Sequence, residues 1–165
     1  MQRALALLSV VLLTGSCAAG TGTSPTGGIC HAGETTYFQC STAHHKSLGL
    51  CGNLPSTLQY RYGKPGKVEL QFPDQAADGA KLLLYAHYHR YQTDRSEVTF
   101  SHAGVDYAVF DYTESGKRSA GVHVTTADGA EHEVLCDGAI HGRLDALKNS
   151  LRCDADNALN GGNCP

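Results

Sequence analysis

Four histidines have the spacing that a metal site on a β-sheet would need. His87 and His89 are two residues apart in a strand-like segment, so both side chains are expected on one face. His123 and His132 flank Asp128-Gly129, the strongest two-residue hairpin signal in the chain, and are expected as diagonal neighbours on the outer face of that hairpin. Two imidazoles on one face can begin a Zn²⁺ or Cu²⁺ site, but nothing nearby supplies the further ligands. We therefore expect surface histidines and no cofactor. The alternative is a His-based metal-binding protein or an enzyme of the periplasm.

Other catalytic and ion-binding patterns are weaker. Asp154, Asp156 and Asn157 resemble the start of a Ca²⁺ loop, but Ala158 and Leu159 occupy positions where such a loop needs an oxygen ligand and a glycine. The Gly-x-Ser-x-Gly pattern of serine hydrolases is absent from the sequence. The sequence therefore predicts a protein without enzymatic activity.

Five of the eight tyrosines lie in residues 81–112, which also carry the densest β-type pattern of the chain and include Arg90 and Arg95. Tyrosine and arginine are enriched at protein interfaces, where they combine a large contact area with polar groups. Tyrosine is equally a good strand residue whose ring packs at the edge of a core. Both interpretations stay open for this set: Tyr85, Tyr88, Tyr91, Tyr107 and Tyr112, with Arg90 and Arg95.

The N-terminus predicts export. Residues 1–17 contain one early charge and then a short apolar run, which is typical of a signal peptide and too short to span a bilayer. The run ends in a lipobox-like sequence at Cys17, which predicts lipidation of that cysteine; cleavage after Ala18 or Ala19 is the alternative. Residues 18–28 then form a flexible linker, and residues 29–165 form one β domain that includes a C-terminal helix and tail.

Alternating apolar and polar residues, separated by short turns, predict an all-β fold. Lys64-Pro65-Gly66-Lys67 favours a type II turn, and Ala103-Gly104 and Glu114-Ser115-Gly116 favour further turns. A tight turn at Asp128-Gly129 would pair Thr125 with His132 and would place Leu135 on the inner face. Leucines at helical spacing predict one late helix over residues 142–152. We expect a small antiparallel sandwich or barrel of about eight or nine strands, stapled by disulfides.

Cysteine parity predicts three disulfides. The chain has seven cysteines, and either processing route removes or blocks Cys17, which leaves an even set. A hairpin centred near residues 45–46 would bring Cys40 opposite Cys51. For the other four cysteines we expect Cys136–Cys153, with Cys30–Cys164 joining the termini.

The charge of the chain excludes some partners. The formal net charge is −3, or −4 once Arg3 is lost with the leader, and no cluster of lysine and arginine is present. This balance argues against nucleic-acid binding. Membrane association is expected only through the lipid anchor.

Residues 101–107 (SHAGVDY) resemble a motif of the bacterial C-type lysozyme inhibitors, which are small periplasmic or lipid-anchored β-barrels. Ser101, Gly104 and Tyr107 match the motif, Ala103 replaces its inhibitory serine, and Lys117 corresponds to a lysine of a later loop. The resemblance implies a partner-binding set of Ser101, His102, Gly104, Tyr107 and Lys117. It also matches Cys136 to the closing cysteine of that family, which implies a Cys40–Cys136 disulfide in place of the pairing above.

These observations together predict an exported bacterial envelope protein, either periplasmic or lipid-anchored to the outer membrane. Its expected activity is non-enzymatic binding of a protein or glycan partner, and the resemblance suggests a lysozyme. A purely structural lipoprotein is a further alternative.

Overall fold

In a computed structural model, residues 28–164 are described. The predicted leader, the lipidation site Cys17 and nearly all of the predicted linker lie outside the described residues. Within the described range no helix has the length and apolar character needed to cross a bilayer.

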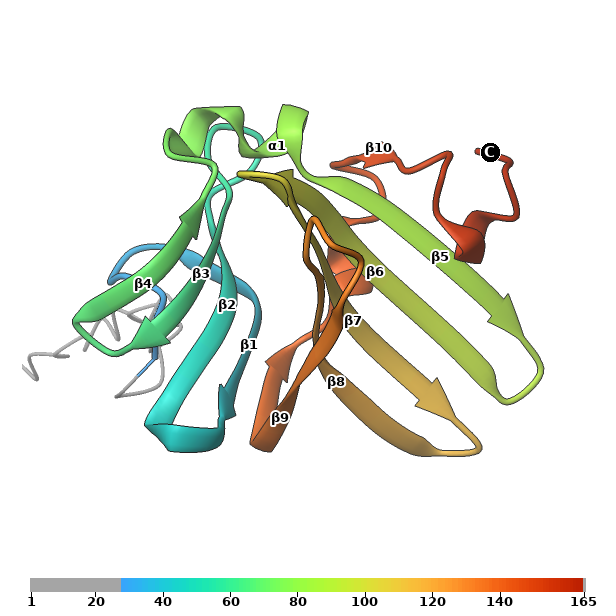
Figure 1. The fold of residues 1–165 in the computed structure, drawn as a ribbon, viewed down its shortest axis with the longest axis horizontal. Coiled ribbons are helices and arrows are strands. Elements are labelled where there is room, and N and C mark those ends of the chain that lie inside the picture. The colour runs from blue at the N-terminus through green and yellow to red at the C-terminus, as the bar shows by residue number, and fades with distance from the viewer. Residues whose placement is uncertain (1–27, 165) are drawn as a thin grey trace, which may run out of the picture.

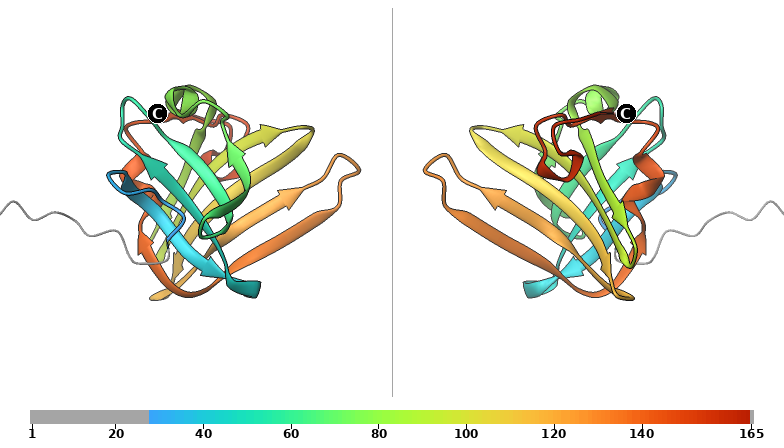
Figure 2. Two further views of the ribbon diagram at one scale, coloured as in Figure 1. Left: turned by 90° about the vertical axis from the view of Figure 1, so that its left-hand side faces the viewer. Right: turned by 90° about the vertical axis from the view of Figure 1, so that its right-hand side faces the viewer.

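Ten strands in residues 28–164 form one sheet that curls into a half-barrel (Figures 1 and 2). The strands follow the order β10-β5-β6-β7-β8-β9-β1-β2-β3-β4 across the sheet. Their bounds are β1 Thr35–Thr42, β2 Lys46–Gly52, β3 Gln59–Lys64, β4 Lys67–Phe72, β5 Leu84–Arg90, β6 Thr93–His102, β7 Val105–Glu114, β8 Lys117–Thr125, β9 Glu131–Gly142 and β10 Arg152–Cys153. Short helical turns connect or follow them: η1 Ala43–His45, η2 Ala76–Asp78, α1 Gly79–Leu82, η3 Leu144–Leu147 and η4 Ala158–Asn160. The all-β prediction is confirmed.

Turn chemistry explains three of the hairpins. Lys64 pairs with Lys67 across a turn in which Gly66 has a φ of 76°. The β6–β7 turn places both Ala103 and Gly104 at positive φ, the conformation that two-residue hairpins need. Ser115 and Gly116 do the same between β7 and β8. These turns are where the sequence predicts them.

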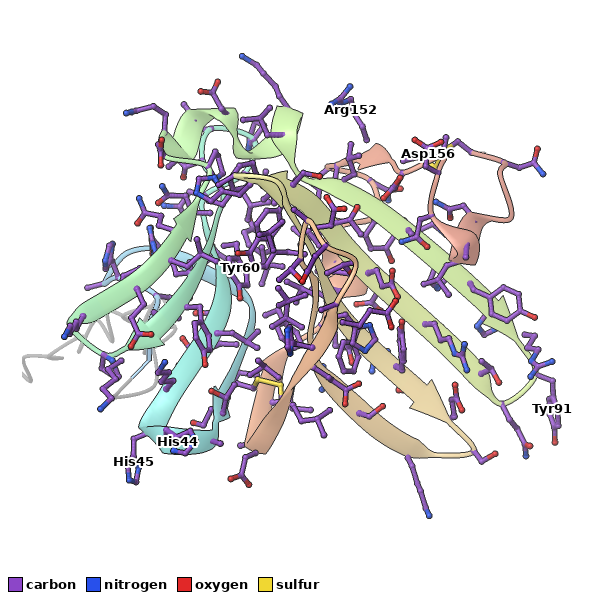
Figure 3. All side chains as sticks on the ribbon, viewed as in Figure 1. His44, His45, Tyr60, Tyr91, Arg152 and Asp156 are labelled. Carbon is purple, nitrogen blue, oxygen red and sulfur yellow. A yellow bond between two sulfur atoms is a disulfide. The ribbon has the colours of Figure 1, made fainter. Side chains whose placement is uncertain are left out.

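The core fills the concave side of the half-barrel. Tyr60 lies at its centre (Figure 3), and η3 closes one side of the core with Leu144 and Leu147, both fully buried. Other fully buried apolar side chains come from strands in both halves of the sheet, among them Phe38, Leu48, Leu50, Val98 and Val109. Leu58 and Leu83, which directly precede β3 and β5, are also fully buried. The curved sheet therefore supplies most of the core, and η3 completes it without a second sheet.

The predicted helix over residues 142–152 is wrong in its extent. Strand β9 continues to Gly142, and only Leu144–Leu147 form a single turn of 3-10 helix. The backbone N–H of Arg143 bonds to the carbonyl of Tyr37, so pairing with β1 holds the chain until the turn begins. Leu144, Leu147 and Leu151 are nevertheless buried, so the leucine spacing identified the core residues correctly.

The predicted register of the β8–β9 hairpin is wrong by one residue. Thr125 pairs with Glu131 rather than with His132, because the loop spans Thr126 to Ala130 instead of two residues. Asp128 stabilises this longer loop by accepting bonds from the Thr126 hydroxyl and the Ala130 N–H. A slip of one residue moves every side chain of β9 to the other face, so Leu135 is on the outer side and half exposed.

The three predicted disulfides are wrong in their pairing. The bonds are Cys30–Cys51, Cys40–Cys136 and Cys153–Cys164, in place of Cys40–Cys51, Cys136–Cys153 and Cys30–Cys164. Cys40 lies opposite Leu48 in β2, whereas Cys51 lies opposite Thr36, so the two cannot meet across the hairpin. The Cys40–Cys136 bond is the one that the lysozyme-inhibitor resemblance implies.

The segment before β1 packs on the convex side of β1–β3. Ile29 is buried, its N–H bonds to the side chain of Gln39, and Cys30 is tied to Cys51. The buried guanidinium of Arg61 holds the carboxylate of Glu34 through both oxygens. This hydrogen bond lowers the pKa of Glu34 below its ordinary value.

Strand β9 joins the two halves of the sheet. Its first half pairs with β8 and its second half with β1, and Cys40–Cys136 crosses the second junction.

We expect the Cys40→Ala/Cys136→Ala variant to lose about 4 to 5 kcal/mol of unfolding free energy, since this bond closes a loop of about 100 residues. The Cys153→Ala/Cys164→Ala variant, whose bond closes a short loop, should lose about 3 kcal/mol. Chemical denaturation measures both; an equal loss in the two variants would contradict this role.

The ion pair of Glu34 predicts a pH dependence. Because the folded protein lowers the pKa of Glu34, the pair stabilises the fold above the ordinary pKa of 4.5 and loses this effect as the pH falls through the lowered value. The Glu34→Gln variant should therefore lose less unfolding free energy than the wild type between about pH 7 and about pH 3. Asp74→Asn, which changes an exposed carboxylate, is the control. Identical pH profiles for wild type and Glu34→Gln would refute the assignment.

Candidate functional site

The first predicted histidine pair does share one face. His87 and His89 lie on the inner face of β5, near the end of the β5–β6 hairpin, and Asp94 of β6 lies between them. The Nε2 atom of His87 is 3.4 Å from one carboxylate oxygen of Asp94, and Nδ1 of His89 is 3.0 Å from the other. The two rings thus contact different oxygens of one carboxylate. Across residues 28–164 no three His, Cys, Asp or Glu side chains are arranged to hold a metal ion.

The second histidine pair does not form. His123 lies opposite Glu133 and His132 lies opposite Val124, so the two imidazoles lie on opposite faces of the hairpin. His123 stacks on Phe110 with ring centroids 4.3 Å apart, and its Nε2 is 2.9 Å from a carboxylate oxygen of Glu133. The register shift therefore removes the geometry on which this pair depended.

The predicted partner-binding residues separate into two places. Ser101, His102, Gly104 and Tyr107 lie at the β6–β7 hairpin, whereas Lys117 begins β8 and pairs with Glu114 at the opposite end of β7. The ring of Tyr107 stacks on Phe100 at 4.8 Å, and His102 contacts the edge of Phe72. The fold thus uses Tyr107 and His102 to close the core beside β4, and it does not bring Lys117 to them.

The tyrosines also divide between the two sides of the sheet. Tyr85 points inward, where its hydroxyl lies 3.0 Å from that of Ser96 and where burial raises its pKa. Tyr88 and Tyr112 lie on the outer face, on either side of Arg95 in the strand pairing. The interface interpretation therefore applies to the outer tyrosines and the core interpretation to Tyr85 and Tyr107.

A groove runs along this outer face, between strands β6 to β9 and the tail that follows β10. It consists of two adjoining cavities of about 590 and 1010 Å³, which share Ala108, His123, Thr125, Asp156 and Asn157. Figure 3 shows Asp156 on the tail, above β5. Ser101 and Tyr107 of the predicted set line the first cavity. We call this feature the outer groove.

The lining of the outer groove is acidic. Six carboxylates line it, and neither cavity has a lysine or an arginine among the described residues of its lining. The acidic residues are Glu97, Asp106, Glu131, Glu133, Asp154 and Asp156. Because no lysine or arginine of the lining neutralises these carboxylates, such a surface can attract and hold a cationic group of a ligand.

The floor of the outer groove is a hydrogen-bonded network around Glu97. Glu97 is buried, and its carboxylate accepts a bond from the Tyr112 hydroxyl and one of 2.6 Å from the side-chain N–H of Asn157. Burial is the main cause that raises the pKa of Tyr112 well above its ordinary value, and the bond to Glu97 is the second cause. Asn157 belongs to the tail, so this network holds the tail wall of the groove against the sheet.

Further contacts fix the same wall. Residues 152–153 pair with β5 as the short strand β10, and the backbone N–H of Asp154 bonds to the carbonyl of Tyr85. The side chain of Asn160 accepts a bond from the N–H of His87, and Cys153–Cys164 closes the tail into a loop. The tail therefore has a defined position despite its irregular backbone.

Sequence reasoning missed the outer groove because its two walls are far apart in the chain. The cluster of Asp154, Asp156 and Asn157 was visible as a polar feature, but only the β10–β5 pairing shows that it faces strands β6 to β9.

The chain matches no protein-family model, no curated protein and no solved structure.

The network around Glu97 yields a test of how the groove is built. Asn157→Ala removes a donor from a buried carboxylate and also the acceptor for the Leu159 N–H, and we expect a loss of about 1 to 3 kcal/mol. Amide hydrogen exchange over residues 154–164 should accelerate, while exchange in β7 should not change. Asn149→Ala, at an exposed position, serves as the matched control. Unchanged exchange in the tail would show that Asn157 does not hold this wall.

Proposed function

We propose that this chain is an exported, non-enzymatic binding protein of the bacterial envelope whose outer groove holds a basic segment of a protein partner. The observation that carries the proposal is the lining of that groove, where six carboxylates face a cavity without lysine or arginine. Clefts lined by one sign of charge concentrate ligands of the opposite sign and accelerate their association.

The carboxylates differ in their availability to a ligand. Glu97 is buried and bonded to Tyr112 and Asn157, so it serves the structure. Glu131 and Asp156 are exposed and form no ion pair within residues 28–164, so they can bond to incoming lysine or arginine side chains. They belong to the two walls of the groove, the β9 side and the tail.

The rigidity of these walls supports binding without rearrangement. The tail is closed by Cys153–Cys164 and bonded to the edge of β5, and the opposite wall consists of paired strands. A preorganised site loses less conformational entropy when it binds, so more of the interaction energy appears as affinity.

The cysteines support export from the cytoplasm. The described residues contain three disulfides, which indicates an oxidising environment outside the cytoplasm. The signal-peptide pattern and Cys17 support a periplasmic protein or one that is lipid-anchored to the outer membrane.

A C-type lysozyme is the first partner to test, because it is strongly basic and because residues 101–107 resemble the inhibitors of that class. Ser101 and Tyr107 of this motif line the outer groove, whereas Lys117 lies at the other end of β7. The proposed contact is therefore the groove and the adjoining β6–β7 hairpin, without Lys117.

Titration calorimetry and lysozyme turnover with purified protein test this proposal. We expect binding that weakens with salt, and we expect Glu131→Gln/Asp156→Asn to weaken it about 10-fold or more through loss of two charges. Asp74→Asn/Asp137→Asn removes the same charge from exposed positions outside the groove and should leave affinity nearly unchanged. Equal affinity for the two double variants would remove the groove from the mechanism.

The same experiments also test whether the partner is a lysozyme. Binding without inhibition would keep the groove as a basic-segment site and exclude the lysozyme active site as its target. No binding to any C-type lysozyme or to poly-lysine would refute the proposed function.

A further inference from the structure

The outer face of β5–β9 has opposite charge at its two ends. Alternation along the paired strands places Arg90, Arg95, Lys117 and Glu114 on this face at the end of the β5–β6 and β7–β8 turns. Three cations therefore accompany one carboxylate there. The carboxylates of the outer groove occupy the other end of the same face. Figure 3 shows how far apart the two ends of β5 lie: Tyr91 is at the tip of the β5–β6 hairpin, and Asp156 is near the opposite end of β5.

The cationic end is also an aromatic surface. Tyr88, Arg95 and Tyr112 are neighbours across β5, β6 and β7, and the guanidinium of Arg95 lies 5.2 Å from the centre of the Tyr112 ring. Arg90 lies 6.0 Å from the ring of Tyr88. We call these four residues, together with Lys117, the Arg/Tyr end.

Several side chains of the Arg/Tyr end are free to contact another molecule. Tyr88 is 38% exposed, and neither Arg90 nor Lys117 forms an ion pair within residues 28–164. Arg95 is bonded to Glu114, which fixes its guanidinium over Tyr112. Tyrosine and arginine in this arrangement are the residue types that dominate binding energy at protein interfaces.

We propose that the outer face binds a second copy of this chain, with the Arg/Tyr end of each copy against the outer groove of the other. A two-fold axis that lies in the plane between the two faces and runs across the strands turns one face toward the other and reverses the strand direction between the copies. It therefore sets the positive end of each copy opposite the acidic end of the other, so both contacts are attractive. The same rotation makes the interface self-complementary and limits assembly to a dimer.

The face is small for a stable interface. Strands of about ten residues at about 3.3 Å per residue, spaced about 4.8 Å apart, give a face of roughly 600 Å² on each copy. This area is at the low end for specific protein complexes, and so the dimer should be weak and should depend on concentration and salt.

The dimer has a consequence that rests on the proposed function. Because the second copy occupies the outer groove, it competes with a basic partner for the same carboxylates. A low concentration of the protein, or an excess of partner, then leaves the groove open.

Charge reversal at exposed positions tests the dimer without any partner present. Sedimentation equilibrium of wild-type protein at low salt should show a monomer–dimer equilibrium that shifts to monomer in about 1 M NaCl, where the Debye length is about 3 Å. Arg90→Glu/Lys117→Glu, and separately Glu131→Lys/Asp156→Lys, should each weaken the dimer about 10-fold or more, since each variant then sets like charges opposite each other.

The two variants together give the decisive measurement. An equimolar mixture should form a heterodimer, because the carboxylates introduced at the Arg/Tyr end of one variant meet the lysines introduced in the groove of the other, while the unaltered groove and the unaltered Arg/Tyr end attract each other as in the wild type. Restored dimer in the mixture would show that both variants fold and that these two ends meet. A wild-type protein that stays monomeric at about 1 mM, a concentration that populates even millimolar complexes, would overturn the inference. So would a mixture that stays monomeric.

These outcomes are independent of the lysozyme experiment. A heterodimer in the mixture, combined with no binding to lysozyme or poly-lysine, would refute the proposed function and keep the dimer. A monomeric wild type that binds a basic partner would do the reverse.

Discussion

Strand β9 pairs with both halves of the sheet, and the rest of the structure depends on that shared pairing. Its residues 131–135 bond to β8, and from Cys136 to Gly142 it bonds to β1, beside the Cys40–Cys136 disulfide. Gly142 then turns the chain into the core, where the Arg118 guanidinium bonds to the Gly142 carbonyl and to both oxygens of Asp111. This places η3 on the concave side. From there residues 152–153 reach β5, so the outer groove is a consequence of how β9 ends.

Carboxylates do two different kinds of work in this fold, and burial separates them. Asp111 and Glu97 are buried, and each accepts several hydrogen bonds that compensate for the loss of water. Asp111 fixes a chain reversal, and Glu97 fixes the tail. Glu131 and Asp156 remain exposed on the groove walls and keep their charge available to a ligand. Buried carboxylates therefore stabilise the structure that forms the groove, and exposed carboxylates on its walls give it a negative charge.

Local features of this fold could be predicted from the sequence, and the features that depend on distant pairing could not. The turns at Gly66, Gly104 and Gly116 need positive φ, and glycine marks them directly. The loop at Asp128-Gly129 carries the same signal, yet the Asp128 side chain stabilises a longer loop, and one added residue reversed the faces of β9. Disulfide pairing and the groove both depend on which strands meet, and hairpin geometry alone chose the wrong partner for Cys40.

The edges of the sheet favour association through its face. Strand β4 is one edge, and it carries Lys67 and Glu69 with an irregularity in its pairing to β3, features that discourage another strand from adding there. The β5 edge is covered in part by β10, and the backbone N–H of His87 donates a hydrogen bond to the side chain of Asn160. The tail thus protects an edge and forms a groove wall at once. With both edges guarded, the outer face, with its opposite charges and aromatic rings, is the surface best able to bind another chain.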